Sequence, residues 1–374
     1  MVMWVIIMWS ALILTAMALV YVSNRVCQFG CIKCITHDSE KRKAAIGGGI
    51  VFGLFLIVGY FINFMNAIVC VIYFAMSWII CDLLFCLWQK LTKRVSNRYY
   101  AGALAILLAF AGLAYGWYAD HHVWRTEYHL TTDKNINSLK IVMFADSHFG
   151  TTFKADGFAK HMERIKQENP NAVILVGDFV DDDTTKEDMI AAAEILGQIK
   201  TKYGVYFVFG NHDSGYYGPE YRGFSSAELV AELEKNGVKV LRDETILLDD
   251  NFYIVGRKDY SVEKEARGTR LSMSELVENL AKDKYIIVAD HQPADYKKQA
   301  QSEVDLVISG HTHGGQLFPF NNVGKWIGAN DMIYGHEKRR KTDFIVTSGI
   351  SDWAIKFKTG TKSEYVVINI AKNR

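Results

Sequence analysis

Four long apolar runs in the first third of the chain restrict its fold more strongly than any other feature of the sequence. They occupy residues 2–22, 44–65, 67–88 and 99–118. Asp82 is the only Asp, Glu, Lys or Arg within them. Because about 20 helical residues cross the roughly 30 Å apolar layer of a bilayer, each run is predicted to be a spanning helix. Residues 1–118 are therefore expected to form a four-helix transmembrane domain.

The charges between these runs predict how the helices cross the membrane. The connections 23–43 and 89–98 together carry nine Lys and Arg residues, whereas the turn between the second and third runs carries none. Lys and Arg are enriched in short loops on the cytoplasmic side. We therefore expect a multi-pass protein of the cell membrane whose residues after 118 face away from the cytoplasm.

Two features of this domain have more than one reading. Cys27, Cys31 and Cys34 are either a metal-binding or lipid-attachment cluster or reduced thiols on a cytoplasmic loop. Asp82 is costly in lipid and should face the interior of the bundle, in a structural hydrogen bond or in a functional role.

The charge balance narrows the range of partners. The net charge is +1, and residues 119–374 contain 33 Lys and Arg against 38 Asp and Glu. A general nucleic-acid binder needs an excess of positive charge, so no nucleic-acid partner is expected. Since half of the residues are hydrophobic, intrinsic disorder is excluded as well.

The rest of the chain has the pattern of a layered α/β domain at residues 138–374, preceded by a juxtamembrane connector at 119–137. Short runs rich in Val, Ile and Phe lie at 139–145, 172–177, 205–210, 285–290, 304–310, 343–349 and 364–370. Helical stretches separate many of them, and such alternation is typical of α/β architecture. A hairpin-like stretch is predicted at 238–256.

Capping boxes predict where three of the helices begin. They are Thr184-x-x-Glu187, Ser225-x-x-Glu228 and Ser272-x-x-Glu275. In such a box the Ser or Thr side chain and the Glu side chain each accept a hydrogen bond from a backbone N–H of the first turn.

Residues of metal-binding type follow five of the predicted strands. The segments are Asp146-Ser147-His148, Gly177-Asp178-Phe179-Val180-Asp181, Gly210-Asn211-His212-Asp213, Asp290-His291 and Gly310-His311-Thr312-His313. Open α/β sheets build their sites at the carboxyl ends of strands. Carboxylate, amide and imidazole groups suit divalent ions such as Mn, Zn or Fe, and one carboxylate can bridge two ions. The series therefore predicts a metal centre.

The ordered motifs D-x-H, G-D-x-x-D, G-N-H-D, H and G-H-x-H resemble those of the calcineurin-like metallophosphoesterase superfamily. The resemblance covers roughly residues 138–370. The G-H-T-H-G-G-Q sequence and the membrane tether are similar to a bacterial membrane-associated branch, which includes lipid-directed phosphodiesterases and UDP-diacylglucosamine pyrophosphatases. The resemblance implies an α/β sandwich that binds two divalent metal ions.

The resemblance also implies a role for each motif residue. One metal ion would be bound by Asp146, His148, Asp178 and His313, and the other by Asp178, Asn211, His291 and His311. His212 would donate a proton to the leaving oxygen. Asp181 is the expected partner that orients His212, with Asp213 as the alternative, unless Asp181 is only a solvated member of the acidic run 181–183. Asp290 is expected to be structural.

The substrate is suggested by two segments that follow the third and fifth motifs, at 214–224 and 316–336. The second is unusually apolar for a loop, with Leu317, Phe318, Phe320, Trp326, Ile327, Met332 and Ile333. Such a loop either covers a core or meets an apolar partner. The latter would place the lipid bilayer and a phosphorylated lipid among the partners of this chain.

These features together imply a membrane-anchored phosphoester hydrolase in which a metal-bridging hydroxide attacks phosphorus. The expected substrate is a lipid or lipid-linked phosphodiester or pyrophosphate at the outer face of the membrane. One alternative is an enzyme like UDP-2,3-diacylglucosamine pyrophosphatase with a cytoplasmic catalytic domain. Another is a non-catalytic membrane receptor that binds a ligand on the same fold.

Overall fold

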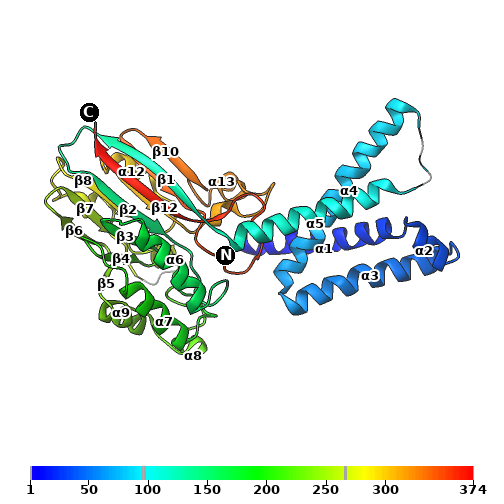
Figure 1. Cartoon of the computed structure of the whole chain (residues 1–374), viewed down its shortest axis with the longest axis horizontal. Coiled ribbons are helices and arrows are strands. Elements are labelled where there is room, and N and C mark those ends of the chain that lie inside the picture. Colours follow the sequence, from blue (N-terminus) through cyan, green and yellow to red (C-terminus); the bar gives the residue numbers. More distant parts are fainter. Residues whose placement is uncertain (1, 95, 97, 265–267, 374) are drawn as a thin grey trace. The chain divides into compact units, whose positions relative to one another are not determined.

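The chain divides into two compact units (Figure 1), and the computed structural model describes residues 2–94, 96, 98–264 and 268–373. The helical unit comprises Met1–Trp117 together with Ala354–Phe357. The α/β unit comprises Tyr118–Trp353 together with Lys358–Arg374.

The helical unit contains the four long helices that the apolar runs predict. Its elements are α1 (Val2–Val26), α2 (Gly30–Ile35), α3 (Glu40–Phe61), α4 (Phe64–Thr92) and α5 (Tyr100–His121), the last of which continues into the α/β unit. Within the described residues, α1, α3, α4 and α5 are each long and apolar enough to cross a membrane. The fold prediction for this part of the chain is therefore confirmed.

The charge in the third apolar run is paired inside the helical unit. The Asp82 carboxylate lies 2.9 Å from Arg25 Nε and accepts hydrogen bonds from the hydroxyls of Tyr21 at 3.1 Å and Tyr99 at 3.3 Å. Three partners compensate for the cost of placing a carboxylate among apolar helices. Of the two roles considered for Asp82, the structure shows the structural hydrogen bonds.

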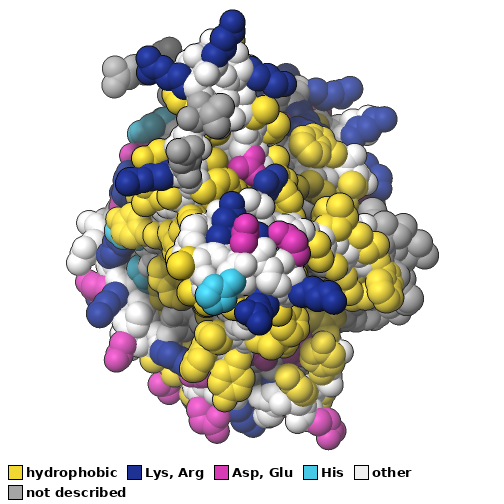
Figure 2. Space-filling view, turned by 90° about the vertical axis from the view of Figure 1, so that its right-hand side faces the viewer, with side chains coloured by type: hydrophobic (Ala, Val, Ile, Leu, Met, Phe, Trp, Pro, Cys, Tyr) yellow, Lys and Arg dark blue, Asp and Glu magenta, His cyan; other side chains and the backbone are white. Residues whose placement is uncertain are grey.

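The two basic connections lie at the same end of the helical unit. Figure 1 shows α2 and the end of α4 at one end, and the turn between α3 and α4 at the other. Figure 2 looks onto the end that carries α2, where Lys and Arg side chains lie beside hydrophobic ones. In the first connection, the thiol of Cys27 is buried and donates to the backbone oxygen of Lys43, whereas Cys31 and Cys34 are exposed.

The α/β unit is built on two six-stranded sheets (Figure 1). The first has the order β1 (Val123–Thr132), β12 (Ser363–Lys372), β2 (Leu139–Phe144), β3 (Ala172–Val176), β4 (Val205–Val208), β5 (Val238–Leu241). The second has the order β10 (Gly335–Arg339), β11 (Thr342–Val346), β9 (Leu306–Ser309), β8 (Tyr285–Ala289), β7 (Phe252–Gly256), β6 (Glu244–Leu248).

The helices of the α/β unit are shorter than those of the helical unit. They are α6 (Ala155–Gln167), α7 (Lys186–Gly197), α8 (Pro219–Arg222), α9 (Ser226–Lys235), α10 (Ser261–Lys264), α11 (Met273–Val277), α12 (Tyr296–Gln301), the 3₁₀ turn η1 (His313–Gly315) and α13 (Val323–Trp326).

The central strands of both sheets are buried on both faces, and this produces four layers. In β3, for example, Val173 and Leu175 pack under α6, α7 and α9, whereas Ile174 and Val176 point into the core between the two sheets. Side chains alternate across a strand, so a continuous apolar run supplies both faces. α11 and α12 cover the outer face of the second sheet. The predicted α/β sandwich is confirmed.

The segment expected to be a connector at 119–137 contains a strand. β1 pairs in parallel with β12 over its whole length, from Val123 beside Ser363 to Thr132 beside Lys372. β1 is an edge strand in which half-buried and exposed side chains alternate, with buried residues near its two ends. Its polar face made the segment look like a linker, so the connector expectation is corrected for these ten residues.

Two smaller expectations also change. The stretch 238–256 contains an antiparallel pair, β6 and β7, but its first strand, β5, belongs to the other sheet. The capping boxes at Ser225 and Ser272 are confirmed. The one at Thr184 is wrong by one residue, because Thr185 caps α7 while the Thr184 hydroxyl donates to the backbone oxygen of Phe149 at 2.7 Å.

Candidate metal centre

The five polar segments all follow strands at the carboxyl edge of the sandwich. Three come directly after the adjacent parallel strands β2, β3 and β4 of the first sheet, and two come after the adjacent parallel strands β8 and β9 of the second. Because parallel neighbours end at the same edge, side chains that are up to 167 positions apart in the sequence are brought together there.

Six of the predicted ligands form two groups in the structure. Asp146, His148 and His313 form one, and Asp178, His291 and His311 form the other. Within each group, one possible ligand atom of every residue lies within 4.8 Å of the others. Asp178 Oδ2 is 3.1 Å from His291 Nε2 and 3.8 Å from His148 Nε2, so this carboxylate is close to both groups.

Asn211, the seventh predicted ligand, has a buried amide oxygen that is available to a metal ion. Its Nδ2 donates to the Tyr216 hydroxyl at 2.8 Å, whereas Oδ1 is buried and has no hydrogen-bond partner in the described part of the chain. His148 Nε2 is also buried and unpaired there. Leaving a buried polar atom unpaired costs about 1–3 kcal/mol, and a bound cation would remove that cost. The donor set of carboxylates, imidazoles and one amide fits Mn, Zn or Fe.

Each of three histidines uses its other ring nitrogen for a fixed hydrogen bond. The acceptors of Nδ1 are Asp181 Oδ2 for His148 at 3.2 Å, the Val176 oxygen for His291 at 2.7 Å and the Ser351 oxygen for His313 at 3.3 Å. Such bonds fix the ring orientation and leave Nε2 available to a metal ion, an arrangement that is usual for metal-binding histidines.

The hydrogen bonds of Asp181 and Asp213 in the described part of the chain go to groups other than the His212 ring. Asp181 bonds to His148 instead, and it also accepts from the backbone N–H of Asp183 at 2.9 Å. Asp213 accepts four backbone N–H bonds, from residues 178, 179, 180 and 210. Both candidates for orienting His212 thus have other hydrogen-bond partners among the described residues.

Aromatic rings surround His212. Its ring centroid lies 4.9 Å from that of His148, 5.1 Å from that of Tyr216 and 5.5 Å from that of Trp353. Its backbone N–H donates to Asp178 Oδ1 at 2.9 Å. His212 is therefore held beside the two ligand groups by its backbone and by ring contacts.

The backbone at the centre is strained in a way that is typical of functional sites. Left-handed φ values occur at Asp146 (55°), His148 (37°), Asp178 (51°), His311 (72°) and His313 (48°). Such conformations cost about 1–3 kcal/mol each and persist only where surrounding structure enforces them. Gly177, at φ +81°, has no room for a Cβ atom, which would lie 2.7 Å from the Gly210 nitrogen.

Burial and neighbouring charges move the pKa values of these groups apart. Burial raises the pKa of Asp146 to about 6 and that of Asp213 to about 7. Burial lowers the pKa of His313 well below its ordinary value. Burial alone would raise the pKa of Asp178, but the charges of His291 and His212 hold it well below its usual range. Strongly perturbed groups of this kind cluster at functional sites.

The sequence did not point to one further segment that completes the centre. Residues 348–353 follow β11, which is a sixth strand end at the site. The Ser351 oxygen accepts from His313, and the Trp353 ring contacts His212. A Cβ atom on Gly349 would lie 2.8 Å from Asp146 Cβ. The fully buried Lys358 donates to the oxygens of Ser348 and Ser351, both at 2.9 Å. The run ending at 349 was predicted as a strand, but the residues after it, which include Asp352, match none of the five motifs.

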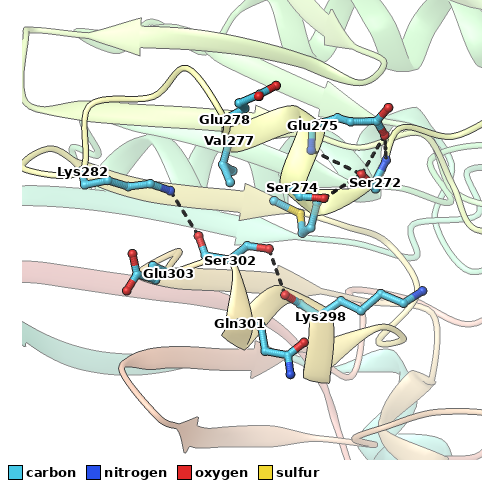
Figure 3. A pocket seen from close by; sticks show the side chains of 11 residues that line it. Ser272, Ser274, Glu275, Val277, Glu278, Lys282, Lys298, Gln301, Ser302 and Glu303 are labelled. Atoms are coloured by element: carbon cyan, nitrogen blue, oxygen red, sulfur yellow. Dashed lines mark hydrogen bonds between the residues drawn. The ribbon is translucent and has the colours of Figure 1, made fainter.

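A separate pocket of about 640 Å³ lies beside α11 and α12 (Figure 3). Its polar side chains bond to one another and to the backbone: Lys282 donates to the Ser302 oxygen, and Ser302 Oγ donates to the Lys298 oxygen. No predicted site residue lines this pocket. It is therefore distinct from the metal centre.

Comparisons with known proteins agree with the geometry of the centre. The family model described as calcineurin-like phosphoesterase matches residues 139–315, a range that begins with β2, ends with η1 and contains all five polar segments. A transmembrane protein with metallophosphoesterase domain from Danio rerio is 29% identical over 242 residues, covering 62% of this chain and 53% of the relative. This chain thus spans about half the length of that relative.

Two further likenesses involve a bacterial protein and a solved structure. An uncharacterized metallophosphoesterase from Aquifex aeolicus is 31% identical over 219 residues, covering 58% of this chain and 77% of the relative. The crystal structure of a dimetal phosphatase from Danio rerio aligns with a TM-score of 0.35 at 13% identity, covering 58% of this chain and 88% of that one. The sequence matches, together with the intact motifs, show that the chain belongs to the calcineurin-like metallophosphoesterases.

Proposed function

We propose that this chain hydrolyses a lipid or lipid-linked phosphodiester or pyrophosphate at the outer face of the membrane with two divalent metal ions. The observation that carries the proposal is the pair of ligand groups at one sheet edge, with Asp178 close to both. The helices α1, α3, α4 and α5, each able to span a bilayer, make a membrane-embedded substrate the natural choice.

The ligand roles that we propose follow the two groups. One ion would be bound by Asp146, His148, Asp178 and His313, and the other by Asp178, Asn211, His291 and His311. Bound there, the two ions would supply an activated hydroxide for in-line attack on phosphorus and would neutralise charge on the phosphoryl oxygens. The Nδ1 hydrogen bonds of His148, His291 and His313 keep their Nε2 atoms directed at the site.

His212 is proposed to protonate the leaving oxygen. Its ring lies beside the ligand His148 and is not itself in either ligand group. Burial lowers the pKa of His212, while the charges of Asp178 and Asp181 act in the opposite direction. We propose that Asp181 assists in this way, through its charge and through the His148 ring that it orients, without a direct bond to His212.

The outer-face location rests on the distribution of charge in the helical unit. Both basic connections lie at one end (Figure 1), which the positive-inside rule assigns to the cytoplasm. If the α/β unit were cytoplasmic, an activity like that of UDP-2,3-diacylglucosamine pyrophosphatase would become the better proposal. A non-catalytic receptor is disfavoured because every predicted ligand is present and His212 lies beside them.

The hydrolase proposal is tested with the purified full chain in phosphatidylcholine nanodiscs loaded with Mn²⁺. We expect hydrolysis of bis(p-nitrophenyl) phosphate that is abolished by a chelator and restored by Mn²⁺. Vesicle lipids with phosphodiester and pyrophosphate headgroups would then be compared as substrates. A metal-loaded chain that cleaves no phosphomonoester, phosphodiester or pyrophosphate would contradict the enzyme proposal.

A further inference from the structure

Most of the exposed large hydrophobic side chains of the α/β unit lie in three short segments that adjoin the metal centre. We call this set the aromatic rim: Tyr216, Tyr217, Tyr221, Phe318, Phe320, Trp326, Ile327 and Trp353. Elsewhere in the described part of this unit, large hydrophobic side chains are exposed only at Tyr118, where α5 enters the unit, and at Leu247, Leu271 and Tyr334. The rim is therefore concentrated where substrate would enter.

Each segment of the rim is connected to the site. Tyr216 accepts a hydrogen bond from Asn211 and packs its ring on His212, and Trp353 packs on His212 as well. The segment with Phe318 and Trp326 starts directly after η1, which begins with His313. The rim thus adjoins the groups that would handle the phosphate, by contact at Tyr216 and Trp353 and through the chain at the third segment.

The composition of the rim suits a lipid surface. Trp326 and Phe318 are 72% and 61% exposed. Contiguous exposed apolar groups mark a surface that meets an apolar partner. Trp and Tyr have an apolar body and a polar tip and are enriched where a bilayer meets water. Lys325, beside Trp326, is exposed and adds a positive charge that complements lipid phosphates.

The chain itself brings one rim residue to the membrane. Ala354, the residue after Trp353, belongs to the helical unit, where its backbone oxygen accepts hydrogen bonds from Asn63 and Asn66, both at 2.9 Å. Asn63 is the N-cap of α4 and Asn66 lies in its first turn, next to the connection from α3. Because both helices are long and apolar enough to span a bilayer, we expect this connection at a membrane surface. Consecutive Cα atoms are about 3.8 Å apart, which leaves Trp353 next to that surface.

We propose that the aromatic rim is a lipid-contacting surface. It inserts into the interfacial layer of the bilayer and holds the apolar part of a phosphorylated lipid while the phosphate reaches the metal centre. This inference rests on the proposed function for its substrate. The contact between the rim and the bilayer can be tested without any turnover.

The test uses spin labels on single cysteines of the full chain, with the six native cysteines replaced, in phosphatidylcholine vesicles. Phe318→Cys and Trp326→Cys report on the rim. Leu247→Cys and Leu271→Cys are controls, because these residues are exposed but lie outside the rim, and Leu107→Cys on α5 is the reference for lipid exposure. Collision rates with oxygen and with a water-soluble nickel complex are then measured for each label.

We expect the rim labels to resemble the label at 107, with frequent oxygen collisions and at least tenfold fewer nickel collisions than at 247 and 271. Rim labels as accessible to nickel as the controls would overturn the proposal, because the rim would then lie in water. Rim labels shielded from both reagents would also overturn it, because a protein surface would cover them. Hydrolysis of bis(p-nitrophenyl) phosphate by the same samples reports on the proposed function separately.

Discussion

At the scale of single residues, His212 differs from the other histidines of the centre because it lies beside the ligands and in neither ligand group. We predict that His212→Ala retains its metal ions but slows cleavage of an alkyl phosphoester by about 10²–10⁴-fold, the usual loss for a general acid. A nitrophenyl ester needs little protonation and should be affected much less. Metal analysis and steady-state kinetics check this, and an unchanged alkyl-ester rate would exclude the acid role.

The missing side chain of Gly349 is predicted to leave the space that Asp146 needs for its position at the site. It has φ +78°, and a Cβ there would lie 2.8 Å from Asp146 Cβ. Gly237 is a matched control, since it has φ +81° and a Cβ added there would meet nothing within 4 Å. Gly349→Ala should therefore weaken metal binding by at least tenfold, whereas Gly237→Ala should carry only the backbone strain. Equal metal affinities in a Mn²⁺ titration of the two variants would contradict this.

The cluster of candidate ligands was predictable because metal chemistry restricts residue type. Asp, Asn and His at strand ends have few other reasons to recur in series, and the structure brings them to one edge. Gly349 acts through a missing side chain, and Ser351 acts through its backbone oxygen. Neither role has a signature in residue type. The choice of His148 as the partner of Asp181 depends on how two loops fold against each other, which sequence spacing does not determine.

At the scale of elements, α9 and α7 illustrate two different uses of a Ser or Thr before a helix. Ser225 completes a capping box, so Ser225→Ala should cost about 1 kcal/mol and lower Tm by about 2–4 °C without loss of activity. The Thr184 hydroxyl instead accepts from the Asp181 N–H at 3.0 Å, so Thr184→Ala should also reduce activity. Melting curves and hydrolysis rates of the two variants distinguish a loss of stability alone from a loss of activity. Full activity in Thr184→Ala would contradict the role proposed for the Thr184 hydroxyl.

The elements that the sequence predicts best are those with apolar faces on both sides. β3 and β8 are buried throughout and stand out as continuous apolar runs. β1 does not, because one face of this edge strand is exposed and polar. Its partner β12 also lies some 240 positions away, as in the pairing of Val123 with Ser363. A long-range pairing of that kind leaves no local pattern from which it could be read.

At the scale of the whole molecule, the orientation in the membrane decides which phosphoesters the α/β unit can meet. Lys160 on α6 and Lys41 on α3 are both exposed, and they provide matched positions for single cysteines in a chain without its native six. We predict that a membrane-impermeant thiol reagent labels Lys160→Cys in intact cells and Lys41→Cys only after lysis. The reverse pattern would place the α/β unit in the cytoplasm and favour the pyrophosphatase alternative.

The central claim is that Asp178 joins two metal sites into one catalytic centre. The most direct measurement is the number of Mn²⁺ ions that each chain retains after gel filtration. The unchanged chain is compared with Asp178→Ala and with the control Asp249→Ala. Asp249 is a suitable control because its carboxylate pairs with Lys202 on the surface. We predict about two ions for the unchanged chain and for Asp249→Ala, and fewer than one for Asp178→Ala. Two ions retained by Asp178→Ala would contradict it.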